Sequence, residues 1–225
     1  RRRSPTGRRQ EGKRAMKHRG ILIVVSGFSG AGKGTLMKEL LGRYENYALS
    51  VSMTTRAPRP GEKDGESYFF VDRETFERTI AQEGLIEYAS YCGNYYGTPR
   101  AYVEEQLDAG RDVILEIEIQ GALKVKERFP EALLLFVMPP SAEELKRRLM
   151  GRGTESEEVI LQRLERASEE AEGIEQYEYL IINDKLEECV EQMHAIISAA
   201  RNNPARNKQL IADMRSQLDA LVKGE

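Results

Sequence analysis

The sequence predicts an α/β fold in which helices cover both faces of a parallel core sheet, a three-layer α/β/α arrangement. From residue 20 onward, near-continuous apolar runs alternate with segments of helical periodicity. Strands that are buried on both faces give such unbroken apolar runs, and helices between them make the strands parallel. The first run is followed by a glycine-rich turn and then by a helical segment, which is the order strand, loop, helix.

The predicted strands and helices alternate along the chain. The apolar runs that we expect to form strands are 21–26, 48–53, 113–119, 133–138 and 179–182. The segments with helical periodicity are 33–43, 99–109, 122–128, 142–150, 157–172 and 186–202. Ser141 and Glu144 form a capping-box signal at the start of one of these helices. Parallel sheets bind ligands at the carboxyl ends of their strands, which directs attention to the loop after the first strand.

That loop has the composition of a phosphate-binding loop. Its residues are Gly27, Phe28, Ser29, Gly30, Ala31, Gly32, Lys33, Gly34 and Thr35. The glycines allow consecutive backbone N–H groups to curl around an anion, and the helix that follows points the positive end of its dipole at the same place. Lys33 adds a full charge that reaches the outer phosphates. The loop therefore predicts binding of a nucleoside triphosphate.

The loop departs from the usual pattern at Gly34, where a serine or threonine normally follows the lysine. Gly34 has no hydroxyl to offer to Mg²⁺. We therefore expect no firm side-chain ligand to the metal, which would be held mainly by the triphosphate and water. Thr35 is the possible exception, and it serves the inner phosphates.

Composition favours a single core with an inserted subdomain and excludes several classes of function. The chain has 225 residues, of which 40% are hydrophobic and 32% charged. Residues 1–19 hold nine basic residues and one acidic residue, whereas the rest of the chain holds 25 basic and 36 acidic residues. We expect this tail to be a disordered extension without a part in the chemistry, and a nucleic-acid or membrane role for it is the alternative. The acidic body is not typical of a nucleic-acid-binding protein.

Cysteine and histidine usage argues against a disulfide framework or a histidine-based metal site. Only two cysteines and two histidines are present, and Cys92 and Cys189 lie far apart. No apolar run approaches the length of a membrane span, which is about 18 residues or more. These observations predict a reduced, cytoplasmic protein with no membrane partner.

Two segments interrupt or follow the alternating pattern. Residues 54–98 are rich in tyrosine, glycine, proline and charge, and we expect them to form a small mixed β insert with a helix at 73–82 and a strand at 85–91. After Pro204, a second helix is expected over 205–222. Its apolar positions are Leu210, Ile211, Met214, Leu218 and Leu221. They share one face, which we expect to pack on the core, with self-association as the alternative.

The start of the insert predicts a second anion site. Arg56 and Arg59 lie three residues apart in a turn that Pro58 and Pro60 stiffen. Two guanidinium groups on a rigid loop suit a phosphate dianion. Tyr68 and Tyr96 offer hydroxyls for the same anion and rings for a base. A phosphate loop alone fits GTPases, ATPases and kinases alike, and this second site favours a kinase.

The segment 52–68, with its Thr-Thr-Arg-x-Pro-Arg-x-Gly-Glu run, and the segment 93–98 closely resemble the nucleotide-monophosphate pocket of guanylate kinases. The resemblance spans roughly residues 20–200. It implies a P-loop kinase fold with a mobile lid, GMP or dGMP and ATP as substrates, and Mg²⁺. It further implies that the GMP phosphate is held by Arg56, Arg59, Tyr68 and Tyr96, and that guanine is read by Ser52, Glu87, Thr98 and Glu118. Glu62 falls on the family's glutamate in the same loop.

The chemistry of guanine agrees with this assignment. Guanine presents N1–H and the N2 amine as donors, which a carboxylate such as Glu87 accepts, while a hydroxyl such as Ser52 or Thr98 donates to O6. Adenine has an acceptor at N1, so it would leave buried polar groups without partners. Glu116 and Glu118 end an apolar run two residues apart, and we expect both on one face of a strand. The family more often has aspartates there, so ion pairing is the alternative role for these glutamates.

The segment 147–156 resembles the lid of these kinases. By resemblance, Arg152 and Arg163 contact the phosphates of both nucleotides together with Arg56, and Asn183 lies near the ATP base. Charge neutralisation would then fall to Lys33, Arg56, Arg152, Arg163 and Mg²⁺. Arg147 is expected to be a surface residue. We divide the chain into a tail (1–19), a core (20–53 and 99–203) with a lid at about 150–158, an insert (54–98) and a C-terminal helix (204–225).

Two other functions compete with this one. The Gly-Ala-Gly-Lys-Gly-Thr string resembles adenylate kinases, although the 52–98 pocket does not. A catalytically silent guanylate-kinase-like domain that binds proteins is the second rival, but such domains tend to lose the phosphate loop that this chain keeps. The sequence leaves open whether the protein is a monomer or a homo-oligomer.

Overall fold

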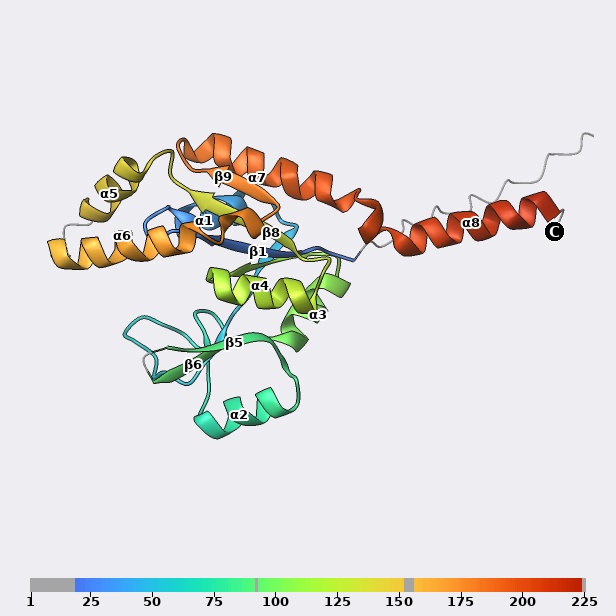
Figure 1. Cartoon of the computed structure of the whole chain (residues 1–225). Helices are drawn as coiled ribbons and strands as arrows, with labels where there is room; N and C mark the ends of the chain where they lie inside the picture. The colour runs from blue at the N-terminus through green and yellow to red at the C-terminus, as the bar shows by residue number, and fades with distance from the viewer. Residues whose placement is uncertain (1–18, 92, 152–155, 224–225) are drawn as a thin grey trace, which may run out of the picture.

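The computed structural model describes residues 19–91, 93–151 and 156–223. Two sheets organise this part of the chain (Figure 1). The core sheet has the order β2-β7-β1-β8-β9, and every neighbouring pair is parallel. Its strands are β1 (Leu22–Gly27), β2 (Tyr47–Leu49), β7 (Asp112–Glu116), β8 (Leu133–Met138) and β9 (Tyr179–Ile182). The predicted fold class, an α/β fold with a parallel core sheet, is confirmed.

The second sheet belongs to the insert and has the order β4-β3-β6-β5. Its strands are β3 (Met53–Thr54), β4 (Phe69–Phe70), β5 (Leu85–Tyr91) and β6 (Asn94–Pro99). Strands β3 and β4 are parallel, whereas β6 runs antiparallel to both β3 and β5. The sheet is therefore mixed, as predicted, and α2 (Arg73–Ala81) packs beside it with Phe76 fully buried.

Helices cover both faces of the core sheet. Figure 1 shows α1 and α7 on one face and α3 and α4 on the other. The helices of the core are α1 (Lys33–Arg43), α3 (Arg100–Asp108), α4 (Ile119–Arg128), α5 (Ala142–Met150), α6 (Glu157–Ala171) and α7 (Leu186–Arg201). The central strand β1 has Ile23, Val24 and Val25 completely buried, because it lies between neighbours in the sheet and helices on both faces.

Two predicted strands have different boundaries in the structure. The predicted strand 48–53 is divided, because the chain leaves the core sheet after Leu49 and enters the second sheet at Met53. The predicted strand 113–119 ends at Glu116, and Ile119 begins α4 instead. Ile119 is buried at the start of α4, and it would also be buried at the end of a core strand. An apolar run therefore does not distinguish the end of a buried strand from the first turn of a buried helix.

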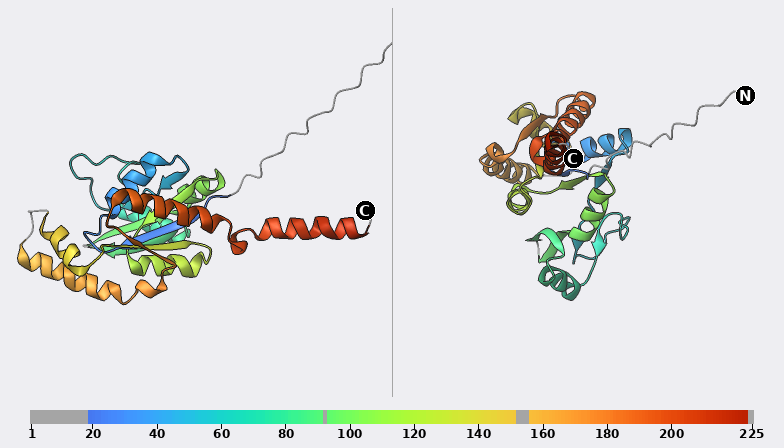
Figure 2. Two further views of the ribbon diagram at one scale, coloured as in Figure 1. Left: turned by 90° about the horizontal axis from the view of Figure 1, so that it is seen from above. Right: turned by 90° about the vertical axis from the view of Figure 1, so that its right-hand side faces the viewer.

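Helix α8 (Lys208–Lys223) projects away from the body of the molecule, as Figure 1 and the left view of Figure 2 show. None of the residues 208–223 is buried, and Leu218 and Leu221 are 53% and 75% exposed. The prediction that the apolar face of this helix packs on the core is therefore wrong. The turn at Pro204–Arg206 redirects the chain, and the Arg206 guanidinium fixes that turn by donating to the Glu131 carbonyl at 2.8 Å.

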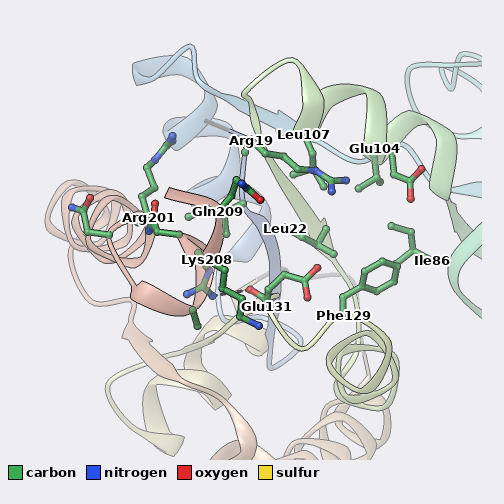
Figure 3. A pocket seen from close by; sticks show the side chains of 17 residues that line it. Arg19, Leu22, Ile86, Glu104, Leu107, Phe129, Glu131, Arg201, Lys208 and Gln209 are labelled. Carbon is green, nitrogen blue, oxygen red and sulfur yellow. Dashed lines mark hydrogen bonds between the residues drawn. The ribbon is translucent and has the colours of Figure 1, made fainter. Parts of the chain in front are cut away.

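A cavity of about 590 Å³ opens where the chain enters β1 (Figure 3). Leu22, Ile86 and Phe129 supply apolar surface, and Glu104 and Lys208 are among its charged residues. The cavity lies at the end of β1 opposite to the glycine-rich loop. The predicted tail lies outside the described residues, except for Arg19. Among the described residues, no helix combines the length and the apolar character that crossing a bilayer requires.

Asp112 joins three elements at this end of the sheet. Its side chain is fully buried and accepts hydrogen bonds from the Ile21 amide at 2.9 Å and from the Asn46 side chain at 3.1 Å. Arg201, in the last turn of α7, pairs with the same carboxylate. The start of β1, the start of β7 and the end of α7 thus meet at one carboxylate.

We expect Asp112→Ala to lower the free energy of unfolding by about 3 kcal/mol, because it leaves a buried amide and Arg201 without their acceptor. Urea denaturation measures this loss. The matched control is Asp108→Ala, which removes an exposed carboxylate that pairs with Arg19 at 3.1 Å. That change should alter stability by no more than about 0.5 kcal/mol. Equal losses in the two variants would contradict the role assigned to Asp112.

Candidate active site

A cleft with a volume of about 870 Å³ opens at the carboxyl ends of β1 and β7. The glycine-rich loop contributes Ser29 and Lys33 to its wall, and the start of the insert contributes Ser52 and Tyr68. The residues that follow β7 and one face of α6 complete the lining. A cleft of this size accommodates nucleotide-sized ligands. The predicted donor loop and part of the predicted acceptor pocket therefore border one space.

The glycine-rich loop has the shape of an anion cradle. Gly30 and Gly32 have φ angles of 90° and 88°, in the left-handed region that favours glycine. A Cβ atom at Gly32 would lie 2.5 Å from the Asn183 side-chain nitrogen, so the turn is also closely packed. The Lys33 ammonium donates to the carbonyls of Gly27 at 2.6 Å and Phe28 at 3.1 Å, which holds its charge over the loop. This arrangement suits a polyphosphate.

Asn183 supports the loop from the end of β9. Its side chain is buried and donates to the Ala31 carbonyl at 2.8 Å, and its own carbonyl accepts from Arg148 at 2.8 Å. The predicted contact of Asn183 with the ATP base stays a prediction, and its contact in the structure is with the loop. Thr35, the possible metal ligand, is exposed in the first turn of α1 beside Gly34.

Arg56 and Glu62 form the centre of the acceptor loop. Two guanidinium nitrogens of Arg56 donate to the Glu62 carboxylate at 2.9 and 3.0 Å, and the Arg59 amide donates to the same carboxylate at 2.7 Å. The Arg56 guanidinium holds the pKa of Glu62 below its usual range. Glu62 therefore fixes the shape of the loop and the direction of Arg56. The Arg59 side chain is exposed at the tip of the loop.

Two tyrosines flank Arg56, as the sequence predicts. The Arg56 guanidinium lies 5.3 Å from the centre of the Tyr68 ring, and the rings of Tyr68 and Tyr96 lie 6.1 Å apart. The hydrogen-bonded ion pair with Glu62 raises the pKa of the Arg56 guanidinium, and a hydrogen bond with Tyr96 raises it further. One fixed cation and two phenol hydroxyls therefore gather on the acceptor side.

Glu87 and Thr98 form a buried pair in the second sheet. The Thr98 hydroxyl donates to the Glu87 carboxylate at 2.7 Å, and both residues are buried. Burial raises the pKa of Glu87, and the hydrogen bond from Thr98 opposes that rise. Strand β3 pairs with β6 so that Met53 lies opposite Gly97, which sets Ser52 beside Thr98. Three of the four predicted guanine-reading residues are thus neighbours.

Glu118, the fourth predicted guanine-reading residue, lies in the cleft lining on a different element. The prediction that Glu116 and Glu118 share one face of a strand is wrong, because β7 ends at Glu116 and Glu118 precedes α4. Both side chains are exposed and line the cleft. Glu118 forms an ion pair with Arg166 of α6, with an N–O distance of 2.6 Å.

Helix α6 approaches the phosphate loop from the predicted lid. The Arg163 guanidinium donates to the Ser29 hydroxyl at 3.0 Å. Ser156 caps the helix by accepting from the Val159 amide. Arg152, the other predicted lid arginine, lies outside the described residues. The predicted contacts of Arg163 and Arg152 with phosphate stay predictions.

Comparison with known proteins identifies the family. The family model for guanylate kinase matches residues 19–200 of this chain. The chain belongs to the guanylate kinase family. It is 55% identical to a guanylate kinase of Halalkalibacterium halodurans over 183 residues, which cover 81% of this chain and 90% of the relative. It is 48% identical to a guanylate kinase of Caldanaerobacter subterraneus over 203 residues, which cover 90% and 98% of the two chains.

A solved guanylate kinase has the same fold. The crystal structure of guanylate kinase from Anaplasma phagocytophilum superposes with a TM-score of 0.66 at 38% sequence identity, covering 84% of this chain and 90% of that one. The family match includes the glycine-rich loop, the insert and α6, and it ends before α8. Helix α8 is therefore outside the part of the chain that the guanylate kinase family model describes.

Sequence reasoning missed two arginines, Arg148 and Arg166, that contact parts of the predicted site. Arg148 reaches the glycine-rich loop, donating to Asn183 and, at 3.4 Å, to the Ala31 carbonyl, whereas its neighbour Arg147 is 75% exposed. Arg147 and Arg148 together lower the pKa of Glu144 to about 2. Arg148 is next to the buried Leu149 on α5. Its position beside the buried face of the helix was the signal that the sequence offered. Arg166 gave no local signal, because its partner Glu118 is 48 residues away.

We expect Gly32→Ala to lower the free energy of unfolding by about 1–3 kcal/mol, because it combines a left-handed backbone with a crowded Cβ. The matched control is Gly34→Ala, since a Cβ there meets nothing within 4 Å and lies in a helix. The control should raise stability by about 0.5–1 kcal/mol. Chemical denaturation should show a lower free energy of unfolding for Gly32→Ala and a higher one for Gly34→Ala. Similar effects at the two positions would contradict the cradle geometry.

Proposed function

We propose that this chain transfers the γ-phosphoryl group of ATP to GMP or dGMP, giving ADP and the guanosine diphosphate. The observation that carries the proposal is that Lys33 of the phosphate loop and Ser52 and Tyr68 of the insert line one cleft. A phosphate loop next to a second nucleotide pocket suits transfer between two nucleotides. Relatives named guanylate kinase at about half identity support GMP as the acceptor.

ATP occupies the glycine-rich loop in this proposal. The loop amides and Lys33 surround its β- and γ-phosphates, and Arg163 reaches the loop through Ser29 at 3.0 Å. Asn183 holds the loop in shape and lies at the end of β9, where the adenine ring would enter. The proposed ATP-contacting residues are those of the loop, 27–35, together with Asn183.

The GMP phosphate meets Arg56, Arg59, Tyr68 and Tyr96 in this proposal. Glu62 keeps Arg56 in a fixed direction through a bidentate ion pair, so little ordering is needed when the phosphate arrives. Arg59 is exposed and therefore able to turn toward the phosphate. The acceptor oxygen is then held within reach of the donor.

Guanine is read by the buried carboxylate of Glu87 with Thr98, Ser52 and Glu118. A buried carboxylate accepts the N1–H and N2 amine of guanine, whereas the N1 acceptor of adenine would face its lone pairs. Buried polar pairing of this kind discriminates by a factor of about 10⁴ or more, because the wrong base leaves groups without partners.

The reaction needs positioning and charge neutralisation more than general-base catalysis. An oxygen of the GMP phosphate forms a bond to the γ-phosphorus of ATP in line, and the bond from that phosphorus to the β,γ-bridging oxygen breaks, so that ADP leaves. The attacking phosphate is already largely deprotonated near pH 7. Lys33, Arg56, Arg152 and Arg163 would balance the negative charge that gathers between the two nucleotides.

Mg²⁺ fits the site as a companion of ATP. Among the described residues no group of three or more histidine, cysteine, aspartate or glutamate side chains could hold a metal ion. The exposed hydroxyl of Thr35, in the first turn of α1, would be one side chain available to it, and triphosphate oxygens and water would supply the other ligands. Bound with ATP, Mg²⁺ neutralises phosphate charge.

An ADP-release assay with GMP, dGMP, AMP and UMP tests the function. GMP and dGMP should support turnover with ATP, while AMP and UMP should give rates lower by several orders of magnitude. Turnover of AMP in preference to GMP would assign the chain to the adenylate type. No turnover with any acceptor, despite intact folding, would favour a catalytically silent protein-binding domain.

Lys33→Met should lower kcat by about 10²–10³ or more while leaving the fold intact, because the charge over the transferring phosphoryl group is removed. Steady-state kinetics measures the loss of kcat, and circular dichroism checks that the fold is intact. Lys38→Met, on the exposed side of α1, is the control and should keep normal turnover. Near-normal turnover in Lys33→Met would contradict its catalytic role.

Glu87→Gln should raise the KM for GMP about 10- to 100-fold, because one acceptor oxygen becomes a donor facing guanine. In the unaltered protein, burial raises the pKa of Glu87, so the carboxylate is protonated and lost as an acceptor at a higher pH than an exposed glutamate. The KM for GMP should therefore rise as pH falls through that range, and Glu87→Gln should remove this dependence.

The control for Glu87 is Glu74→Gln, which alters a glutamate exposed on α2 of the same insert. It should leave both the KM for GMP and its pH profile unchanged. If GMP and AMP kinetics were unaltered in Glu87→Gln, the assignment of base reading to this residue would be wrong.

A further inference from the structure

One face of α6 contacts two separate parts of the cleft lining. Arg163 and Arg166 lie three residues apart, so their side chains leave the helix on the same side. Arg163 donates to Ser29 of the phosphate loop at 3.0 Å, and Arg166 pairs with Glu118 after β7 at 2.6 Å. A single helix therefore connects the triphosphate loop with a residue to which guanine reading is assigned.

Arg166 is held between two carboxylates. Its Nε lies 3.1 Å from Glu170, one turn along α6, and its Nη2 contacts Glu118. Glu170 is 21% exposed and Glu118 is 72% exposed, so the guanidinium is anchored on the helix side and presents its far end to the cleft. Exposed ion pairs contribute little to folding stability, so the bond to Glu118 does little to hold the fold together. The ion pair instead fixes the position of the Glu118 carboxylate.

Glu118 needs such a partner in order to act on a ligand. It belongs to no strand, its long side chain is exposed, and Glu116 lies two residues earlier in the same lining. An unpaired glutamate here would sample several rotamers and would add negative charge to a cleft that receives nucleotide phosphates. Arg166 occupies one carboxylate oxygen, Oε1, and its charge offsets that of Glu118.

We propose that Arg166 is a positioning residue for guanine recognition, holding Glu118 so that its second carboxylate oxygen accepts the N2 amine of the base. The proposal rests on the proposed function, in which Glu118 reads guanine. Arg166 itself touches Glu118 rather than the base. Ordering a free glutamate on binding costs about three- to tenfold in affinity, which sets the size of the expected effect.

The test compares GMP with IMP, whose base lacks the 2-amino group. At saturating ATP, Arg166→Ala should raise the KM for GMP about three- to tenfold while kcat changes by less than about twofold. The KM for IMP should change less, because IMP has no amine for Glu118 to accept. Arg166→Lys keeps the charge and should recover part of the loss.

The matched control is Arg147→Ala. Arg147 is an exposed arginine on α5 that pairs with Glu144 at 2.7 Å, so the change removes an Arg–Glu pair of the same kind outside the cleft lining. It should leave the kinetics with both GMP and IMP unchanged. Circular dichroism of all variants confirms that each is folded.

A double-mutant cycle decides whether Arg166 acts through Glu118. In a Glu118→Gln background, Arg166→Ala should add no further loss with GMP, because its target carboxylate has been removed. Additive losses, equal losses with GMP and IMP, or unchanged kinetics in Arg166→Ala would each overturn the proposal. These outcomes are distinct from failure of the proposed function, in which the unaltered protein itself would not phosphorylate GMP.

Discussion

The anchoring of the glycine-rich loop is the constraint on which the rest of the site depends. Amide groups bind an anion only if they converge, and a loop with four glycines would not converge without support. Here β1 brings the loop out of the centre of the sheet, and Phe28 packs edge-on against Phe136 at 5.1 Å. Asn183 holds the Ala31 carbonyl from β9, and the Lys33 ammonium crosses back over the loop.

The need to hold the glycine-rich loop in a fixed shape also explains why the molecule has two separate sheets. The donor loop is fixed in the core sheet, so the acceptor pocket is built on a second sheet that the chain enters after Leu49. The Ser50 amide donates to the Ile114 carbonyl at 2.9 Å, which fixes the point where the chain leaves the core. Ile86 of β5 still packs in the main hydrophobic core, and α6 lines the cleft together with the phosphate loop and the start of the insert.

The sequence predicted those parts of the molecule whose signals are local. The glycine-rich loop, helix α1, strand β8 and the acceptor loop with Arg56 and Glu62 each depend on neighbouring residues. Errors arose where the tertiary environment decides. The run 48–53 contains no turn signal, yet it is divided between two sheets, and the apolar face of α8 contacts no core because the turn at Pro204 redirects it. Arg166 was missed because its partner lies on another element.

Because α8 is exposed, its backbone amides should exchange hydrogen with solvent by a different route from those of the core. A helix of 16 residues is about 24 Å long and is marginally stable in water without tertiary packing. Its amides should therefore exchange with solvent through local fraying, while those of β1 should exchange only when the whole core opens. Heating or denaturant would melt α8 in a gradual process of its own, and optical signals of helix content would then begin to fall before the cooperative loss of the sheet.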